Sequence, residues 1–261
     1  MNAFRLTLVI ITLLSAVLLV VPLIMLVVQS LSAKPALWPE SFTLKWYKMQ
    51  ANTIIPSVLT SLSIAFPATL CATFISLPLG RVLARHEFYG KKSIQGLITL
   101  PIVIPGVTLG LAYLQLANTG FLREVPPLLM IIIVHVVLIF PYISRAVIAG
   151  YKALDITLEE ASATLGANPR HTFANVIFPL LMPFILAGGI LGFSRSMNDF
   201  IVTIFLIQPN IVPLSIQVYR STSYGTPPLT SALATVLLLF SFAFAVVAES
   251  LLRYTLKKIT G

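Results

Sequence analysis

The sequence predicts an all-α, polytopic transmembrane helical bundle with about six spans and both termini in the cytoplasm. The first observation behind this class is composition: 57% of the 261 residues are hydrophobic and only 10% are charged. A soluble domain carries about 25% charged residues, so this chain lacks the charge to cover a water-facing surface. The second observation is six apolar stretches, each long enough to cross a hydrocarbon core, which takes about 20 residues of helix.

The predicted spans belong to one transmembrane domain over residues 1–261, and only the fifth is interrupted by charge, at Arg195 and Asp199. None of them shows the period-two alternation of a transmembrane barrel. The first span is expected to be a peripheral helix and the others to form the core. Their ranges are 6–28, 56–80, 93–117, 127–144, 183–207 and 229–249.

The net charge of +9 is explained by membrane orientation. With the N-terminus in the cytoplasm, eleven basic residues fall inside, five fall outside, and Arg195 lies within a span. This asymmetry is the one expected from the positive-inside rule. The charge therefore predicts contact with membrane lipid and no nucleic-acid partner.

The third span contains two prolines and a glycine close together, in the segment Leu100–Gly106. Pro101 and Pro105 each remove a backbone hydrogen bond and kink a helix. Such a feature is either a purely structural kink or broken backbone beside a translocation path, a recurring device in transporters. Both interpretations remain open at this point.

The cytoplasmic loop over residues 150–182 has its own helix signals. Thr157 and Glu160 fit a capping box, and Gly166 stands where a C′ glycine ends a helix. Asn168 and Pro169 supply an N-cap and a first-turn proline for a second helix that runs into the fifth span. Two short helices on the membrane face predict a docking element, with an ordinary surface loop as the alternative. A DNA-binding helix-turn-helix is discounted because both ends run directly into spans.

The same loop resembles the EAA loop of permeases from ATP-binding-cassette (ABC) importers, whose pattern is E-A-A, three residues, G, nine residues, I, any residue, L-P. The residues that carry the resemblance are Glu160, Ala161, Ser162, Gly166, Val176 and Pro179. The chain departs from the pattern by small or apolar exchanges at Ser162, Val176 and Phe178. From about Asn52 onward, further segments around residues 100–106, 140–142 and 193–199 are similar to polyamine-type permeases.

The resemblance implies a permease subunit of the bacterial inner membrane with the type I fold. Such a subunit pairs with a second permease, usually a different chain, and receives solute from a periplasmic binding protein. A helix of the EAA loop couples it to an ATPase dimer, and the coupling residues implied here are Glu159, Glu160, Ala161, Ser162, Leu165, Gly166, Asn168, Pro169 and Pro179. The sequence has no G-x-x-x-x-G-K-[ST] motif, so ATP and Mg are expected on a separate ATPase and no cofactor on this chain. Relatives carry polyamines, phosphonates, ferric iron or thiamine, and the similarity in the fifth span favours a polyamine-like solute.

Charged side chains inside a span are costly and usually face the bundle interior, which makes Arg195 and Asp199 the best candidates for the substrate path. Their i, i+4 spacing also allows them simply to neutralise one another. The residues of the candidate path are Ser194, Arg195, Asn198, Asp199, Pro101 and Pro105. His135, in the fourth span, is expected to bond a neighbouring helix more readily than to act as a ligand or proton relay.

Two other classes of protein are alternatives to the importer permease. An ion-coupled secondary transporter needs no ATPase, and its sequence pointer is a pair of broken helices in two related halves. A membrane-embedded enzyme needs clustered His, Asp or Glu within the spans. The sequence shows neither pattern, no metal-ligand set and no catalytic constellation, and neither class accounts for the EAA-like loop.

Overall fold

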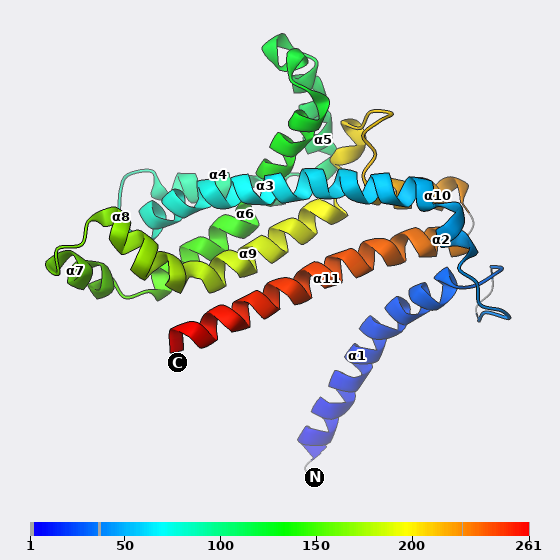
Figure 1. The fold of residues 1–261 in the computed structure, drawn as a ribbon, viewed down its shortest axis with the longest axis horizontal. Helices are drawn as coiled ribbons and strands as arrows, with labels where there is room; N and C mark the ends of the chain where they lie inside the picture. The colour runs from blue at the N-terminus through cyan, green and yellow to red at the C-terminus, as the bar shows by residue number, and fades with distance from the viewer. Residues whose placement is uncertain (1–2, 36–37, 226, 261) are drawn as a thin grey trace. The chain divides into compact units, whose positions relative to one another are not determined.

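The computed structural model describes residues 3–35, 38–225 and 227–260, and the regular elements in these ranges are helices (Figure 1). Two isolated β-bridges, Ser32–Phe42 and Gln208–Ile211, accompany them. The chain divides into two compact units. The first contains residues 1–58 and 213–239, and the second contains residues 59–212 and 240–261.

In the first unit, α1 (Ala3–Ser30) is followed by α2 (Lys45–Met49), and α10 (Leu214–Tyr224) comes late in the chain. The side chains of residues 7–24 of α1 are exposed and almost entirely apolar, as a helix surrounded by lipid requires. The segment after α1 folds back because the Trp46 indole donates to the Ser32 carbonyl at 2.7 Å. The Tyr47 hydroxyl also donates to Ser30 Oγ at 2.7 Å. Two long helices, α3 (Ala51–Arg85) and α11 (Pro227–Thr260), begin in this unit and continue into the second.

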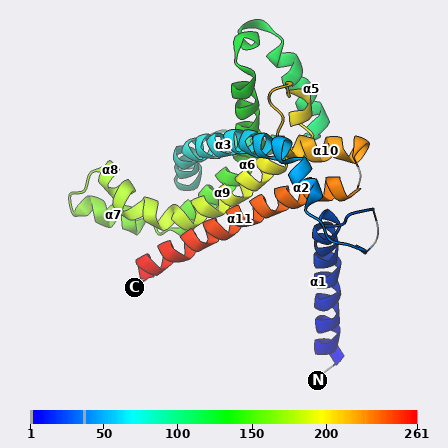
Figure 2. The same cartoon turned by 45° about the vertical axis from the view of Figure 1, so that its right-hand side comes forward.

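The second unit contains most of the buried core. Its elements beyond α3 and α11 are α4 (Lys91–Val103), α5 (Gly106–Ala117), η1 (Gly120–Glu124), α6 (Pro127–Ala153), α7 (Thr157–Thr164), α8 (Pro169–Thr172), η2 (Phe173–Ile177), α9 (Phe178–Asn198) and η3 (Thr203–Phe205). Figure 2 shows α6 and α9 side by side, with α7 and α8 at the end where the chain passes from one to the other. Apolar residues such as Ile64, Ile139 and Leu181 are fully enclosed between these helices.

Close approach of α6 and α9 depends on glycine. A Cβ at Gly188 of α9 would lie 2.9 Å from the Ala146 Cβ and 3.1 Å from the Ile143 Cα of α6. A Cβ at Gly150 of α6 would lie 2.7 Å from the Phe184 ring. Small residues at such positions let two membrane helices pack backbone against backbone, where dispersion contacts are strongest.

The number of spans agrees with the sequence prediction. Five helices are long and apolar enough to cross a membrane, and α4 with α5 forms a sixth, bent span. Most observed helices are longer than the predicted ranges. The span predicted over 127–144, for example, is part of a helix that continues to Ala153, so the loop predicted over 150–182 begins later than expected.

The span predicted over 93–117 is sharply bent within the segment Leu100–Gly106, where α4 and α5 meet at an angle of 101°. Ile104 has extended backbone angles, φ −69° and ψ 132°, and directly precedes Pro105. The proline ring disfavours a helical conformation for the residue before it, so the chain leaves α4 and begins α5 in a new direction. Pro101, in contrast, lies inside α4 without ending it.

The predicted helix over 183–207 also needs correction. It starts earlier, since α8, η2 and α9 form one continuous stretch from Pro169, and it ends at Asn198. Asp199 is extended, with φ −71° and ψ 124°, and is followed by a turn and by η3. Asp199 therefore caps the helix instead of projecting from its side.

Candidate functional site

The loop between α6 and α9 exposes a short amphipathic helix, α7, whose end is fixed by glycine. Gly166 has φ +83°, and its N–H donates to the Ala163 carbonyl at 2.9 Å. The Ala167 N–H donates to the Ser162 carbonyl at 3.1 Å. These two bonds make a Schellman motif, which needs a left-handed residue at the position of Gly166. The predicted C′ glycine is confirmed.

The start of the second helix also agrees with the prediction. Asn168 Oδ1 accepts a hydrogen bond from the His171 N–H at 2.8 Å, and Pro169 is the first residue of α8. An N-cap side chain followed by proline satisfies an otherwise unpaired N–H and presets the helical φ. Ser162 Oγ and Thr172 Oγ1, 2.9 Å apart, tie α7 to α8.

The predicted capping box of Thr157 and Glu160 does not form. Thr157 is already the first residue of α7. The N-cap residue is Ile156, whose side chain makes no capping hydrogen bond. Instead, Asp155 Oδ1 accepts a hydrogen bond from the Thr157 N–H at 3.0 Å. This backbone hydrogen bond is the main reason why the pKa of Asp155 is lowered from its ordinary value. The side chain that accepts a hydrogen bond at the start of α7 is therefore Asp155, two residues before Thr157, where the predicted capping box began.

Apolar side chains of α7 and its flanks are exposed. Ile156, Leu158 and Leu165 have exposed fractions of 47%, 39% and 88%. Glu160 and Ala161 are exposed beside them, and Pro179 is half-buried in the first turn of α9. An exposed apolar surface with carboxylates at its edge is typical of a protein-docking surface. We call the exposed residues Ile156, Leu158, Glu160, Ala161 and Leu165 the α7 face.

Glu159 points the other way, toward the end of α3. Its Oε2 accepts a hydrogen bond from Arg81 Nη2 at 2.7 Å. Its Oε1 lies 3.3 Å from Arg85 Nε, an ion pair without hydrogen-bond geometry. The Glu159 side chain is 15% exposed and that of Arg85 12% exposed. Glu159 therefore attaches α7 to α3, whereas Glu160 is exposed and makes no ion pair within the part of the chain that the structure describes.

The candidate path residues of α9 form a connected polar group. Arg195 Nη1 donates to Asp199 Oδ1 at 2.9 Å, and the Asp199 side chain is 1% exposed while that of Arg195 is 32% exposed. Asn198 is exposed, and its amide donates to the Ser194 carbonyl at 2.8 Å and to Ser241 Oγ of α11 at 3.3 Å. The geometry makes Arg195 the solvent-accessible member of the pair and shields Asp199.

Asp199 also organises the turn that follows α9. Its Oδ2 accepts hydrogen bonds from the N–H groups of Val202, at 3.2 Å, and Thr203, at 3.1 Å, and from Thr203 Oγ1, at 2.8 Å. With these donors on Oδ2 and the Arg195 guanidinium on Oδ1, each carboxylate oxygen has a hydrogen-bond partner, which offsets the cost of burying the charge.

His135 of α6 extends this group, as the sequence analysis expected of a histidine that bonds a neighbouring helix. Its Nδ1 lies 2.7 Å from Ser196 Oγ and its Nε2 lies 3.0 Å from Thr203 Oγ1. Because the Thr203 hydroxyl donates to Asp199, it accepts from His135, which assigns the proton to Nε2 and makes Nδ1 the acceptor for Ser196. The sequence does not single out Ser196 and Thr203 as partners of His135, because hydroxyl residues are common in membrane helices.

Pro101 and Pro105 belong to the bent third span, whereas Arg195 belongs to α9. The bend in the third span lies against the turn that follows Asp199. A Cβ at Gly106, directly after Pro105, would lie 2.8 Å from the Ile201 side chain. Gly110 is similarly close to Phe205. The structure thus brings the broken third span and the broken end of the fifth span together. Among the residues that the structure describes, no group of three or more His, Cys, Asp or Glu could hold a metal ion.

These features define a multi-pass membrane protein that exposes a short helix between two tightly packed spans. Residues 76–261 match the family described as the binding-protein-dependent transport system inner membrane component. The chain belongs to this family and is a permease subunit of an ABC importer, with a multi-pass location in the inner membrane.

Similar proteins include permeases of polyamine and molybdenum transport systems. The chain is 28% identical to the spermidine/putrescine transport system permease protein PotC of Escherichia coli (strain K12) over 251 residues, which cover 93% of this chain and 92% of PotC. It is 29% identical to the putrescine permease PotI of the same strain, covering 88% of this chain and 85% of PotI. It is also 29% identical to the molybdenum permease ModB of Haemophilus influenzae (strain ATCC 51907 / DSM 11121 / KW20 / Rd), covering 78% and 96%.

Solved structures share the fold. A bacterial ABC transporter involved in the import of the acidic polysaccharide alginate superimposes with a TM-score of 0.69 at 13% identity, over 96% of this chain and 95% of that chain. The methionine ABC transporter MetNI, in an inward-facing conformation, gives a TM-score of 0.64 at 15% identity, over 80% and 98%. At this level of identity the likeness establishes the type I permease fold alone.

Proposed function

We propose that this chain is a single permease domain that forms half of the translocation path for a small polar solute, most similar in class to a polyamine. The similarity to PotC and PotI over most of the chain supports this class. A periplasmic binding protein would deliver the solute, and a second, related permease would form the other half of the path. Both termini would lie in the cytoplasm, in accord with the distribution of basic residues.

The observation that carries the coupling mechanism is the α7 face. Its apolar side chains are exposed, although the helix is held at both ends by the Schellman turn at Gly166 and by the Asp155 hydrogen bond. In this proposal the α7 face, together with Ser162, Asn168 and Pro169 of the turn, inserts into a cleft of the ATPase. A displacement of the α7 face would reach α9 through Pro179, which lies in α9. It would reach α3 through Glu159, which α3 holds by an ion pair.

The chain itself would not be catalytic and would bind no cofactor. ATP and Mg would be bound by the ATPase dimer, because this sequence carries no phosphate-binding glycine loop. Closure of the ATPase would move two coupling helices toward each other, and the packed pair α6–α9 would carry that motion into the spans as a rigid body.

The candidate path would run beside the two broken spans. Ser194, Arg195 and Asn198 supply polar groups on α9, and Asp199 holds Arg195 in place. Pro101 and Pro105 belong to the bent span that adjoins the turn after Asp199. Non-helical backbone at membrane depth is tolerated where protein or water satisfies it, which favours a path at this point.

The experiment that tests the proposal compares two glycines that both need a left-handed backbone, Gly166 with φ +83° and Gly120 with φ +54°. Gly166 and Gly120 both have positive φ, and a Cβ at either would meet nothing within 4 Å. Replacement by alanine strains either turn by about 1 kcal/mol. Gly166→Ala is expected to reduce copurification of the cognate ATPase and ATP-dependent uptake, while Gly120→Ala leaves both unchanged.

Glu160→Ala is the second variant, because Glu160 is exposed on the α7 face and its loss leaves the fold intact. It should weaken association with the ATPase at an unchanged amount of protein in the membrane. If uptake persists without any ATPase, or if the Gly166 and Gly120 variants behave alike, the coupling role proposed for the α7 face is wrong.

A further inference from the structure

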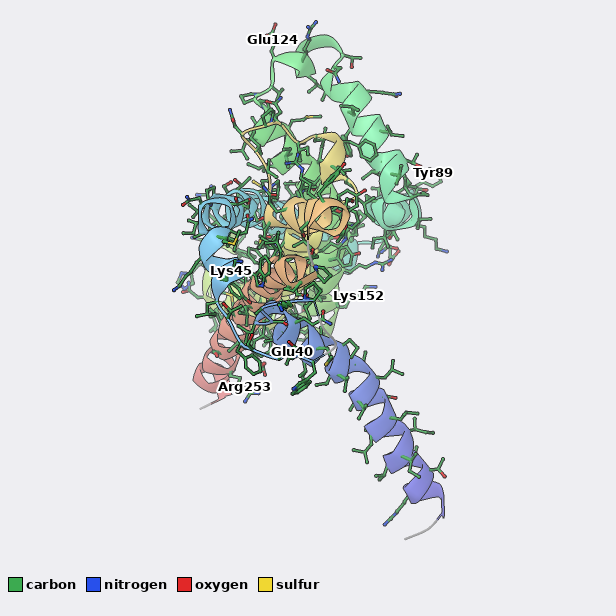
Figure 3. The ribbon with its side chains drawn as sticks, turned by 90° about the vertical axis from the view of Figure 1, so that its right-hand side faces the viewer. Glu40, Lys45, Tyr89, Glu124, Lys152 and Arg253 are labelled. Carbon is green, nitrogen blue, oxygen red and sulfur yellow. The ribbon has the colours of Figure 1, made fainter. Side chains whose placement is uncertain are left out.

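Two adjoining hollows lie between the start of α4 and the end of α6. The first has a volume of about 380 Å³ and the second about 590 Å³, and both are bordered by Gln95 and Lys152. They therefore form one continuous depression, which we call the α4–α6 groove. The polar residues that border it are Glu87, Tyr89, Lys91, Lys92, Ser93, Gln95, Thr99, Arg145 and Lys152. In Figure 3, Lys152 and Tyr89, which also borders the second hollow, lie on the same side of this unit.

The groove carries a net positive charge. In the part of the chain that the structure describes, no carboxylate lies within 4 Å of Lys92, Arg145 or Lys152. Lys91 is neutralised by Glu87, since their Nζ and Oε1 atoms are 2.6 Å apart. The hydrogen bond from Lys91 lowers the pKa of Glu87, which keeps this carboxylate charged but committed to Lys91.

Polar donors complete the wall of the groove. Arg145 Nη2 donates to Thr99 Oγ1 at 3.3 Å, which holds the guanidinium against α4. Gln95 stands one turn before Thr99 on the same helix, within reach of both hollows. The Thr99 hydroxyl itself donates to the Gln95 carbonyl at 2.9 Å, so the donors left for a ligand are three cationic side chains and the Gln95 amide, which suit a phosphate group.

The outer surface of α4 changes from basic to apolar along its length. Lys91 and Lys92 stand in its first turn, and Leu97, Leu100 and Val103 farther on have exposed fractions of 66%, 48% and 74%. Lys152 stands in the last turn of α6, beside the start of α4. A phospholipid presents the same order, with an anionic headgroup at the surface and acyl chains below it.

We propose that the α4–α6 groove binds the phosphate of an anionic phospholipid in the cytoplasmic leaflet. Arg145, Lys152 and Lys92 neutralise the phosphate, Gln95 donates to its oxygens, and the acyl chains lie along Leu97, Leu100 and Val103. The choice of leaflet depends on the orientation given under the proposed function. The bound lipid would hold α4 against α6 beside the bent third span.

The test uses the importer assembled with its partner chains, purified into nanodiscs of neutral phosphatidylcholine mixed with anionic phosphatidylglycerol. Native mass spectrometry then measures which lipid stays bound to the permease. Gln95→Glu is the main variant, because it keeps side-chain size and every Lys and Arg that sets topology, while it places a negative charge in both hollows. One charge beside an anionic headgroup changes affinity about fivefold, and we expect retention of phosphatidylglycerol to fall by at least that factor.

Gln115→Glu is the matched control, since Gln115 is exposed on α5 outside the groove and undergoes the same chemical change. It should retain phosphatidylglycerol like the native chain. A second variant, Lys152→Gln, removes a groove charge without adding an acid and should act in the same direction. Equal loss in both Gln→Glu variants, or no loss in either groove variant, would overturn the proposal.

Two further arms separate the lipid from other anions and from a protein partner. Millimolar inorganic phosphate should leave the bound lipid in place, and phosphate that displaces it in a saturable manner would point to a soluble ligand. Cross-linking of residue 152 to the partner permease would also overturn the proposal. ATPase association is measured on the same samples, so loss of lipid with intact association distinguishes this site from the coupling function.

Discussion

Glu159 of α7 and Arg81 of α3 form a 2.7 Å ion pair between residues 78 positions apart in the sequence. Arg85, one turn farther along α3, approaches the same carboxylate at 3.3 Å. The contact joins the loop that carries α7 to the second span, in addition to the covalent connections of the loop to α6 and α9. Three spans therefore hold α7.

The first prediction tests this attachment. Glu159→Gln should loosen α7 by about 1 kcal/mol, since the pair is only partly buried and is discounted for solvent screening. Hydrogen exchange of the amides of residues 157–164 should accelerate about fivefold. Glu160→Gln is the control, because Glu160 is exposed and makes no ion pair within the described residues. Similar acceleration in both variants would mean that Glu159 does not fix α7.

A second prediction concerns the buried carboxylate of Asp199. Asp199→Asn leaves Arg195 without its charge partner and weakens the hydrogen bonds from Val202 and Thr203, so the unfolding free energy should fall by about 2 kcal/mol. Chemical unfolding of the detergent-solubilised protein measures this loss. Asp155→Asn is the same chemical change at an exposed position that keeps its acceptor oxygen, and it should leave the unfolding free energy almost unchanged. Equal effects would contradict a structural role for the Asp199 charge.

Local features of the chain were predictable from sequence, and contacts across it were not. Gly166 and Asn168 make their hydrogen bonds with residues only a few positions away in the sequence. Their roles as turn and cap therefore follow from spacing alone. The capping box predicted for Thr157 and Glu160 does not form, because Asp155 accepts the hydrogen bond from the Thr157 N–H. His135 finds Ser196 and Thr203 at separations of 61 and 68 residues, which no periodicity reveals. The prolines in Leu100–Gly106 predicted either a kink or broken backbone, and the 101° angle between α4 and α5 could not be read from them.

The third prediction uses the pH dependence of the α7 start. The pKa of Asp155 is lowered in the folded protein, so its stabilisation is complete above the ordinary carboxyl pKa of about 3.9 and is lost as pH falls below that value. Exchange at the first amides of α7 should therefore accelerate on acidification through this range. Asp155→Asn should abolish the pH response, because an amide accepts the same bond at every pH. A response that survives in this variant would assign it to another group.

The last prediction compares neighbouring glycines of α9. Gly188→Ala places a Cβ 2.9 Å from Ala146 and 3.1 Å from the backbone of Ile143, and α6 must shift to admit it. Such overpacking costs about 1–3 kcal/mol, which should appear as a lower midpoint of thermal unfolding. Gly189→Ala meets only the Thr69 methyl at 4.0 Å, an ordinary contact, so the better helix propensity of alanine should leave stability unchanged or slightly raised. If the two substitutions have the same effect, the close packing of α6 on α9 at Gly188 is not what stabilises this pair.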